Sequence, residues 1–438
     1  MLDIRFIREN AEKVKLAAVQ KNLKVDIDLL ISIDDERRVL MQQIEVLRTR
    51  RNEIAQGAKT GKPTPEAIDE WKKIKDDIAI LEAKLAEVEW AYMDIMVKVP
   101  TIPSLDSPIG KHEDENVEIY KWWEIKKFDF TPKSHIEIAE SLDIVDFEKW
   151  VKTAWFRGYY LKNEWALLVM AMMNYALNKV SSKWFKPFIP PTLIKEFALF
   201  WSGYFKWKEY NQEVDEIYQV ATTDKEADGK ESKEKKFLIG TAEPSLLAYY
   251  AWETLKEEDL PIRMSGYSPC YRSEIWSYWK DTKWLYRVHE FMKIEQVVIC
   301  KADVEESDKL HQEMLDISKW LHEALGLPYR VLSICTWDMW TGKYKQFDIE
   351  AWMPGMNRYG ETGSASNFLD WQSRRLNTKY IDKDWNRQFV YMLNDTALPS
   401  VRPLIAILEN YQQADWSVIV PEVLRPFMGW ISVITPKK

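Results

Sequence analysis

The 438-residue sequence predicts an α+β protein, in which an antiparallel two-helix coiled coil precedes a domain built on an antiparallel sheet flanked by helices. The first hundred residues carry an almost uninterrupted helical repeat. After Lys111, short β-branched and aromatic runs alternate irregularly with helical stretches. This pattern favours an antiparallel sheet over the regular strand-helix-strand units of a doubly wound fold.

The predicted coiled coil depends on two segments with the same apolar spacing. In the second segment, steps of three and four residues connect Trp71, Ile74, Ile78, Leu81, Leu85, Val88, Tyr92 and Ile95. The first segment, 33–54, follows the same rhythm, with Arg37 and Arg51 at two positions of the seam. Residues 57–65 contain two glycines and two prolines and predict the turn between the helices. We therefore expect residues 1–100 to form a helical arm.

Prolines mark the end of this arm. Pro100, Pro103 and Pro108 predict a linker over 101–112, followed by one domain over 113–438. Within that domain we expect strands at 188–193, 297–299 and 329–332, and helices at 164–180 and 304–325.

Charge and cysteine content restrict the class of protein. The chain carries 61 basic and 69 acidic residues, so no global positive field attracts nucleic acid, and such a partner needs a local basic patch. Three widely spaced cysteines without a C-x-x-C pair are typical of a reducing, cytoplasmic compartment. The sequence shows neither a signal peptide nor about 18 continuous apolar residues, so we expect no membrane span.

The densest group of functional side chains lies at 262–295. Arg272, Ser273 and Glu274 precede a polar loop, and Arg287 and Phe291 follow it. A guanidinium can bind phosphate with two parallel hydrogen bonds, and an aromatic ring can stack on a base. The residues indicate either a nucleotide pocket or, with equal weight, a charged hairpin with a buried phenylalanine.

This stretch resembles motif 2 of class II aminoacyl-tRNA synthetases, and specifically of the seryl-tRNA synthetase family. Other segments resemble the same family in the same order. They are Pro190-Pro191 (motif 1), 238–243 with its Thr-Ala-Glu, 361–367, and 394–402 with 406–410 (motif 3). The N-terminal arm also resembles the family's, so the likeness spans nearly the whole chain.

The resemblance implies a class II catalytic domain that activates L-serine with ATP and Mg²⁺ and transfers it to tRNA(Ser), with tRNA(Sec) as a further candidate. It also implies a cytoplasmic homodimer, with the arm binding tRNA. Arg272 and Arg402 are then the catalytic residues, on the α- and γ-phosphates. The other residues implied for ATP are Ser273, Glu274, Val288, Phe291, Glu361, Thr362, Gly363 and Ser364. Glu361 and Ser364 are also the implied metal ligands. Serine is assigned to Thr241, Ala242, Glu243, Glu295, Asn394 and Thr396.

Some residues have a plain structural interpretation. We expect His289 to stabilise the hairpin and Cys270 to be a small core residue. Glu409 and Asn410 could form a polar helix face. The basic residues Arg37, Arg38, Arg48, Arg50 and Arg51 are either a solvated face of the arm or contacts to RNA phosphates.

Two other functions remain open. A related ligase could load a carrier protein instead of tRNA, but relatives of that kind lack the arm. A catalytically impaired homologue could act as an RNA-binding protein, although Arg272, Glu274, Glu361 and Arg402 are intact.

Tryptophan is unusually frequent. The chain has 22 tryptophans and 14 glycines, whereas an average content of ~7% predicts about 31 glycines. Thirteen tryptophans stand where the family pattern has glycine: Trp123, Trp155, Trp165, Trp184, Trp201, Trp276, Trp279, Trp284, Trp337, Trp340, Trp385, Trp416 and Trp430. We hypothesise that the gene's UGA codons mean glycine and were translated as tryptophan. Asp395 also replaces a family glycine, and that hypothesis does not explain it.

Overall fold

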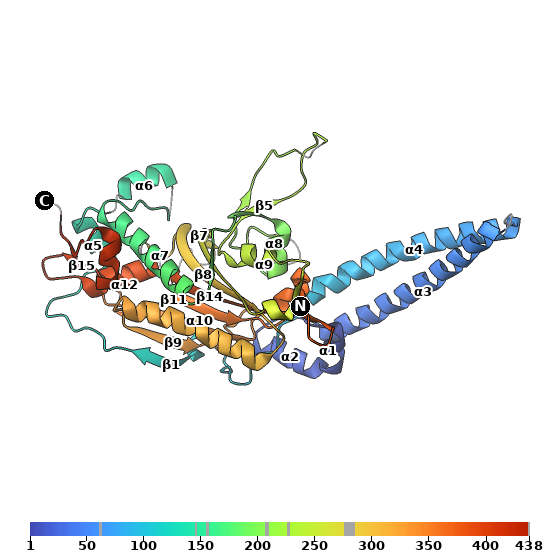
Figure 1. Cartoon of the computed structure of the whole chain (residues 1–438), viewed down its shortest axis with the longest axis horizontal. Coiled ribbons are helices and arrows are strands. Elements are labelled where there is room, and N and C mark those ends of the chain that lie inside the picture. The colour runs from blue at the N-terminus through green and yellow to red at the C-terminus, as the bar shows by residue number, and fades with distance from the viewer. Residues whose placement is uncertain are drawn as a thin grey trace. The chain divides into compact units, whose positions relative to one another are not determined.

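The computed structural model describes residues 1–60, 64–144, 147–154, 157–205, 210–225, 228–275 and 285–436. The chain divides into two compact units, Met1–Ile102 and Pro103–Lys438 (Figure 1). Each unit is built around its own hydrophobic clusters.

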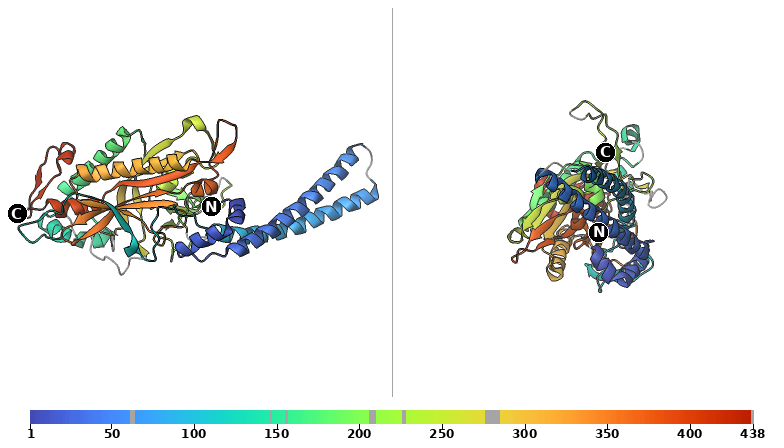
Figure 2. Two further views of the ribbon diagram at one scale, coloured as in Figure 1. Left: turned by 90° about the horizontal axis from the view of Figure 1, so that it is seen from below. Right: turned by 90° about the vertical axis from the view of Figure 1, so that its right-hand side faces the viewer.

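The first unit is helical throughout. Its elements are α1 (Ile4–Glu9), α2 (Ala11–Gln20), α3 (Ile27–Thr60) and α4 (Pro65–Met96). The long helices α3 and α4 lie side by side as a hairpin (Figures 1 and 2), which confirms the predicted arm. The turn at 57–65 was predicted too long. Helix α3 continues through Gly57 to Thr60, and the Thr64 hydroxyl caps α4, with Pro65 in its first turn.

The predicted seam is the packed face of α4. Ile74, Ile78 and Tyr92 are buried, and the other predicted positions are half-buried, except for Trp71, which is exposed. At the seam position of Arg37, the guanidinium stacks on the Tyr92 ring at 4.9 Å and donates to Asp34 at 2.9 Å. Stacking and pairing explain how an arginine fits into this seam.

The second unit is built on an eight-stranded sheet. The strand order is β1-β9-β10-β11-β14-β8-β7-β2, and every neighbouring pair is antiparallel except β2 and β7. The bounds are β1 (Val117–Trp122), β2 (Lys186–Phe188), β7 (Ile262–Tyr271), β8 (Glu290–Cys300), β9 (Tyr329–Ser333), β10 (Lys345–Met353), β11 (Arg358–Asn367) and β14 (Tyr391–Pro399). The α+β architecture predicted from the sequence is therefore confirmed.

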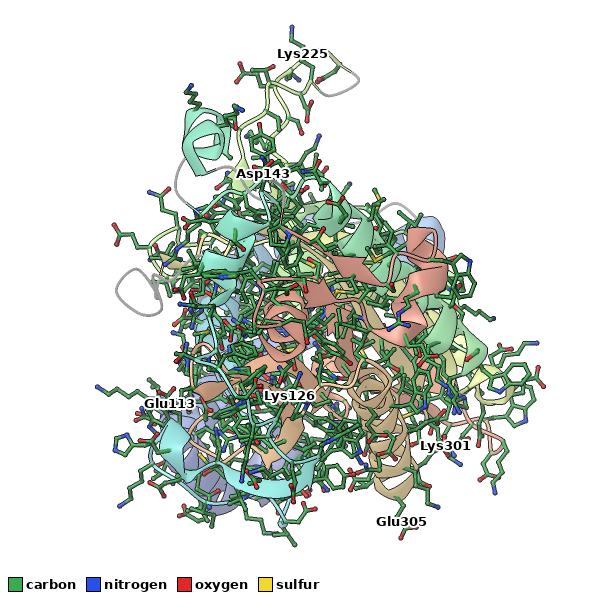
Figure 3. All side chains as sticks on the ribbon, turned by 90° about the vertical axis from the view of Figure 1, so that its left-hand side faces the viewer. Glu113, Lys126, Asp143, Lys225, Lys301 and Glu305 are labelled. Atoms are coloured by element: carbon green, nitrogen blue, oxygen red, sulfur yellow. The ribbon has the colours of Figure 1, made fainter. Side chains whose placement is uncertain are left out.

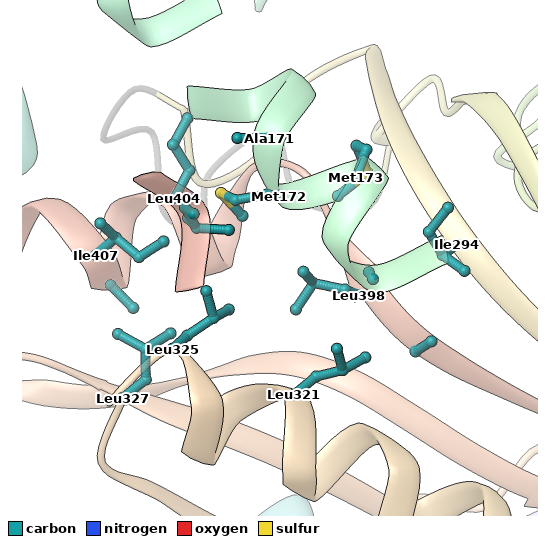
Figure 4. Close-up of a cluster of buried hydrophobic side chains, with 14 of the residues drawn as sticks. Ala171, Met172, Met173, Ile294, Leu321, Leu325, Leu327, Leu398, Leu404 and Ile407 are labelled. Atoms are coloured by element: carbon teal, nitrogen blue, oxygen red, sulfur yellow. The ribbon is translucent and has the colours of Figure 1, made fainter. Parts of the chain in front are cut away.

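Helices α7 (Glu164–Ser182) and α10 (Val304–Ala324) cover one face of this sheet. Their apolar side chains pack with residues of β8, β14 and α12 (Arg402–Tyr411), and Figure 4 shows Met172, Leu321 and Leu398 in this core. Both helices were predicted within two residues of their observed bounds. The opposite face of the sheet carries a second apolar cluster, which includes Met264, Val297 and Leu246, and beside it the polar residues of the site.

Shorter elements surround the sheet. The helices are α5 (His135–Ser141), α6 (Phe147–Ala154), α8 (Glu196–Ser202), α9 (Glu243–Ala248) and α11 (Trp371–Leu376). The strands are β3 (Leu193–Lys195), β4 (Gln219–Val220), β5 (Lys236–Leu238), β6 (Thr254–Lys256), β12 (Lys379–Ile381), β13 (Arg387–Phe389), β15 (Val418–Ile419) and β16 (Val433–Ile434). The strand predicted over 188–193 is broken, since Ile189 to Thr192 separate β2 from β3.

Charged side chains gather on the outside of the second unit. Lys225, Lys301 and Glu305 point outward at its periphery in Figure 3. Among the described helices, none combines the length and the apolar composition that crossing a bilayer requires.

Candidate active site

Strand β8 presents alternate side chains to opposite faces of the sheet. Phe291, Lys293 and Glu295 lie on the face that carries the site, whereas Ile294 packs in the core and Gln296 contacts α10. Strand β14 pairs with β8 and brings Thr396 opposite Glu295. The strand alternation therefore places acidic, basic and hydroxyl groups on one face.

Two arginines from distant segments line the same cleft. Arg272 directly follows β7, and its Nε donates to the Gly240 carbonyl at 3.3 Å. Arg402 begins α12, and its Nη1 donates to the Glu361 carbonyl at 2.9 Å and lies 3.2 Å from Glu361 Oε2. The cleft is lined by Arg272, Glu274, Tyr286, Arg287, Val288, Phe291, Lys293, Glu361, Thr362, Gly363, Thr396, Pro399, Val401 and Arg402. The structure thus brings the two predicted catalytic arginines together.

Three residues of the predicted base pocket, Glu274, Val288 and Phe291, line this cleft. The Arg272 guanidinium sits 5.4 Å from the centre of the Phe291 ring, and Arg287 Nη1 pairs with Glu274 Oε2 at 3.1 Å. Val288 packs in a small apolar cluster with Tyr286 and Val401. The Ser273 hydroxyl oxygen is buried without a hydrogen-bond partner among the described residues. An aromatic face, apolar walls and a fixed carboxylate suit a planar base.

A β-bulge places the two predicted metal ligands on one face. Residues three apart on a regular strand point to opposite sides, which would separate Glu361 from Ser364. In β11, however, Glu361 pairs with Glu350 and Ser364 pairs with Asp348, although these partners are only two residues apart on β10. The extra residue in β11 therefore returns Ser364 to the side of Glu361.

The bulge also turns a predicted ATP-binding hydroxyl away. Thr362 lines the cleft, but its Oγ1 donates to the Ile349 carbonyl at 3.2 Å and lies 2.7 Å from Nε2 of His322 on α10. A Cβ atom on Gly363 would come within 3.0 Å of the Thr396 carbonyl oxygen. Glycine thus lets β11 and β14 approach each other closely here.

Charge in this region favours an ionised Glu361. Loss of hydration in the cleft opposes ionisation, but the nearby Arg402 and Arg272 outweigh it and lower the pKa of the Glu361 carboxyl. By contrast, loss of hydration and the charge of Glu361 raise the pKa of Asp348 to about 7. The described residues hold no group of three or more histidine, cysteine or carboxylate side chains arranged for a metal. Two hard oxygen donors, Glu361 and Ser364, fit a Mg²⁺ ion that takes its other ligands from phosphate and water.

The predicted serine pocket contains unsatisfied polar atoms. Thr241 Oγ1 and Asn394 Nδ2 are buried, and neither has a hydrogen-bond partner among the described residues. Buried polar groups in proteins are nearly always paired, so these two atoms are available to hydrogen-bond a ligand. The Ala242 methyl packs in an apolar cluster, which leaves only its backbone for binding.

Glu243 is held by two donors that the sequence did not indicate. Its carboxylate accepts a hydrogen bond from the Tyr204 hydroxyl at 2.5 Å and another from Gln372 Nε2 at 2.6 Å. Burial raises the pKa of Glu243, and the two donors oppose that rise. These residues come from remote segments, so no local pattern could have found them.

Lys293 was also missed, although strand alternation could have found it. Its Nζ pairs with Glu295 Oε2 at 2.6 Å and lies 3.4 Å from Thr396 Oγ1, which in turn donates to Glu295 at 3.3 Å. Lys293 precedes Glu295 by two residues on β8 and therefore shares its face. The buried Lys293 and Glu295 and the half-buried Thr396 therefore form one network.

Asp395 does not enter this pocket. Its Oδ2 accepts hydrogen bonds from Ser318 of α10 at 2.6 Å and from Gln296 at 2.8 Å. It lies between Asn394 and Thr396 on β14, so its side chain points to the opposite face. An aspartate at this family glycine position therefore does not obstruct the predicted serine pocket.

Four residues were expected to have a structural rather than a catalytic role. His289 and Cys270 are as expected, whereas Glu409 and Asn410 are not. His289 Nδ1 lies 2.9 Å from both the Arg272 carbonyl and the Tyr218 hydroxyl, as expected for a hairpin-stabilising residue. Cys270 is fully buried, and burial raises the pKa of its thiol. The polar-face interpretation of Glu409 and Asn410 is wrong, because both are buried. Glu409 binds His135 and the Gly355 amide.

Known families match both units of the chain. Residues 1–103 match the seryl-tRNA synthetase N-terminal domain, and residues 218–411 match the tRNA synthetase class II core domain (G, H, P, S and T). These matches cover the arm and the strands that carry the site.

Individual relatives match over the full length. A serine–tRNA ligase from Treponema denticola is 39% identical over 436 residues, which span 98% of this chain and 99% of the relative. One from Borrelia recurrentis is 40% identical over 444 residues and 100% of both chains. The crystal structure of seryl-tRNA synthetase from Pyrococcus horikoshii complexed with ATP superposes with a TM-score of 0.87 at 34% identity, covering 100% of both chains. This chain therefore belongs to the seryl-tRNA synthetase family, the class II serine–tRNA ligases.

Proposed function

We propose that this chain activates L-serine with ATP to seryl-adenylate and then transfers the seryl group to tRNA(Ser). The observation that carries the proposal is a set of buried polar side chains. Glu243 and Glu295 are buried carboxylates close enough for their charges to interact, and Thr241 Oγ1 and Asn394 Nδ2 are buried without a hydrogen-bond partner among the described residues. Carboxylates and hydroxyls suit the ammonium and hydroxyl of serine. Alanine would leave these polar groups unpaired, so the pocket favours serine over alanine.

In the activation step, a serine carboxylate oxygen attacks the α-phosphorus of ATP. A new P–O bond forms while the bond to the bridging oxygen of the β-phosphate breaks, and pyrophosphate leaves. The attacking carboxylate is already ionised, so this step needs no general base. Arg272 and Arg402 neutralise the charge on the phosphates, and the pocket fixes the serine carboxylate close to phosphorus.

Glu361 and Ser364 would hold Mg²⁺, which would supply further charge neutralisation on the phosphates. In the transfer step, a hydroxyl of the terminal tRNA ribose attacks the seryl carbonyl carbon. AMP leaves and the hydroxyl proton is released.

The arm and the sheet edge support the proposed partners. Residues 1–100 carry seven arginines, and four of them pair with acidic residues of the same unit: Arg8, Arg37, Arg48 and Arg50. We assign this arm to tRNA binding. Strand β2 lies at one edge of the sheet, followed by the exposed side chains of Ile189 and Leu193. Exposed apolar groups beside Pro190-Pro191 support a homodimer formed through this edge. We also propose that the protein is cytoplasmic and that it charges tRNA(Sec) as well as tRNA(Ser).

Serine-dependent exchange of pyrophosphate into ATP tests the activation step. We expect exchange with serine, almost none with alanine, and a loss of at least about a hundredfold in Arg272→Ala. A charging assay then separates the acceptors: transfer to tRNA supports the proposal, and transfer only to a carrier protein would favour that alternative. Absence of exchange, combined with retained tRNA binding, would identify the impaired homologue.

A further inference from the structure

Six tryptophans adopt left-handed backbone conformations. Their φ angles lie between 63° and 69°, at Trp123, Trp184, Trp252, Trp385, Trp416 and Trp430. In the described part of the chain, fifteen non-glycine residues have positive φ, and tryptophan supplies six of them while asparagine supplies four. This region favours glycine and, less strongly, asparagine, whereas the Cβ atom of a bulky residue is crowded there. Tryptophan is thus concentrated in a conformation that does not suit it.

Two of these tryptophans occupy equivalent places in separate hairpin loops. The Trp385 amide donates to the Asp382 carbonyl at 3.0 Å, and the Asp382 amide donates to Asn386 at 3.0 Å. The Trp416 amide donates to the Gln413 carbonyl at 3.0 Å, and the Gln413 amide donates to Ser417 at 2.8 Å. In short loops of this kind, the last turn residue is left-handed, and glycine is the residue that fits.

A third tryptophan follows a helix. Trp184 comes directly after Lys183, the C-cap of α7, and its amide donates to the Ser181 carbonyl at 3.1 Å. The residue after a C-cap is where helices most often use a left-handed glycine. Three different local structures, two loops and one helix end, therefore each require the same residue type.

Burial of the indoles does not offset the backbone cost. The exposed fractions are 63% for Trp123, 86% for Trp184, 60% for Trp252, 86% for Trp385 and 74% for Trp430. By contrast, Trp371 is only 3% exposed. A Cβ atom on Gly203 or Gly342 would come within 2.5 or 2.6 Å of the Trp371 ring. The fold therefore makes room for Trp371, but not for these five left-handed tryptophans, and the sixth, Trp416, is half-buried.

We infer that the polypeptide made in the cells that express this gene carries glycine at positions 123, 184, 252, 385, 416 and 430, through a codon that those cells read as glycine. Five of these positions also stand at family glycines, and Trp252 is assigned from its backbone alone. The inference does not depend on the proposed activity.

Backbone conformation gives no evidence for glycine at the other eight tryptophans that stand at family glycine positions. Trp165, Trp201, Trp337 and Trp340 do not have positive φ, and Trp165 is buried in the core against α7 neighbours. Trp155, Trp276, Trp279 and Trp284 lie outside the described residues.

Peptide mass spectrometry of the protein purified from its native cells tests the inference directly, and it does not require a recombinant chain to fold. We expect glycine in the peptides that contain positions 184, 252 and 385. Tryptophan in those peptides would overturn the inference.

A second experiment tests the backbone argument on the 438-residue chain. Trp184→Gly and Trp385→Gly should each raise the melting temperature, by about 1 to 3 °C, whereas Trp184→Ala and Trp385→Ala should raise it less. Trp90 is the matched control, because it is 58% exposed and lies within α4. There, glycine should be less stable than alanine. Equal effects of glycine and alanine at 184 and 385 would overturn the backbone argument.

Discussion

The hydroxyl of Tyr204 donates a 2.5 Å hydrogen bond to Oε2 of Glu243, whose side chain is almost completely buried. Gln372 Nε2 binds the other oxygen of the same carboxylate at 2.6 Å. Burial raises the pKa of Glu243, and these two donors stabilise its ionised form. On the proposed function, we expect the binding of a serine ammonium ion to depend on Tyr204 and Gln372, although both act through Glu243.

Tyr204→Phe should weaken serine binding. Removing a hydrogen bond from a buried carboxylate costs about 1.5 to 3 kcal/mol, which corresponds to an increase of roughly 10- to 100-fold in the KM for serine. The KM for ATP should change little. Since the loss of a donor raises the pKa of Glu243 further, the increase in serine KM should be larger at pH 6 than at pH 8. Pyrophosphate exchange at varied serine concentration and pH measures both effects.

Tyr210→Phe is the control for this prediction. The Tyr210 hydroxyl donates to the Ile217 carbonyl at 2.7 Å, so the variant also loses a tyrosine hydrogen bond, but not one to Glu243. A serine KM that rises equally in both variants would show a general structural effect, and an unchanged KM in Tyr204→Phe would contradict the assigned role.

The features predicted best from the sequence are those encoded locally. The spacing of Ile74, Ile78 and Tyr92 predicts the packed face of α4 because each helical turn repeats the same geometry. The turn was predicted to begin at Gly57 because glycine has a weak helix propensity. Helix α3 nevertheless continues to Thr60, since packing against α4 stabilises it.

The site was predictable where strand alternation or the resemblance to known motifs applied. Tyr204 and Gln372 lie 39 and 129 residues from Glu243 along the chain, so their contacts depend on the tertiary fold. Glu361 and Ser364 point to the same face of the sheet because of a β-bulge, and no residue pattern in β11 predicts that bulge.

Arg402→Lys should lower kcat/KM for ATP by roughly a hundredfold in pyrophosphate exchange. Lysine keeps the positive charge, but it loses the planar fork that binds two oxygens at once and that also contacts Glu361. Arg358→Lys is a matched control, since both guanidinium groups stack on the Tyr286 ring, at 4.6 Å for Arg402 and 5.1 Å for Arg358. Similar losses in the two variants would argue against a specific phosphate contact by Arg402.

Acidification should destabilise the second unit through its buried histidines. Burial lowers the pKa of His322 to about 4, below its ordinary value of 6.5. The unfolded chain therefore takes up the proton first, and stability that is complete above pH 6.5 is lost as the pH falls towards 4. The loss amounts to about 3 kcal/mol for this group. His311, with its pKa also lowered to about 4, should add a similar amount.

His322→Gln tests this pH dependence. The variant should be less stable at pH 7.5, because Thr362 Oγ1 loses its 2.7 Å contact with the imidazole. Between pH 6.5 and 4 it should lose less stability than the unsubstituted chain, since one titrating group is gone. Urea unfolding at several pH values measures both changes, with His112→Gln at an exposed position as the control. Parallel pH profiles for the two chains would rule out His322 as a source of the acid sensitivity.

Arg38→Ala should weaken tRNA binding and make it less sensitive to salt. Arg38 is exposed on α3 and makes no ion pair with any described residue, so its charge is available to a phosphate. Loss of one phosphate contact should reduce the slope of log affinity against log salt by about 0.7 to 0.9. Arg50 pairs with Glu70 at 2.8 Å, so Arg50→Ala should have a smaller effect, because binding there must first break that pair. Filter binding of tRNA between 50 and 200 mM salt, roughly the range over which such contacts are resolved, measures both slopes.

Pyrophosphate exchange should stay unchanged in both variants. Unaltered slopes would show that these arginines form a solvated face of the arm and do not contact RNA.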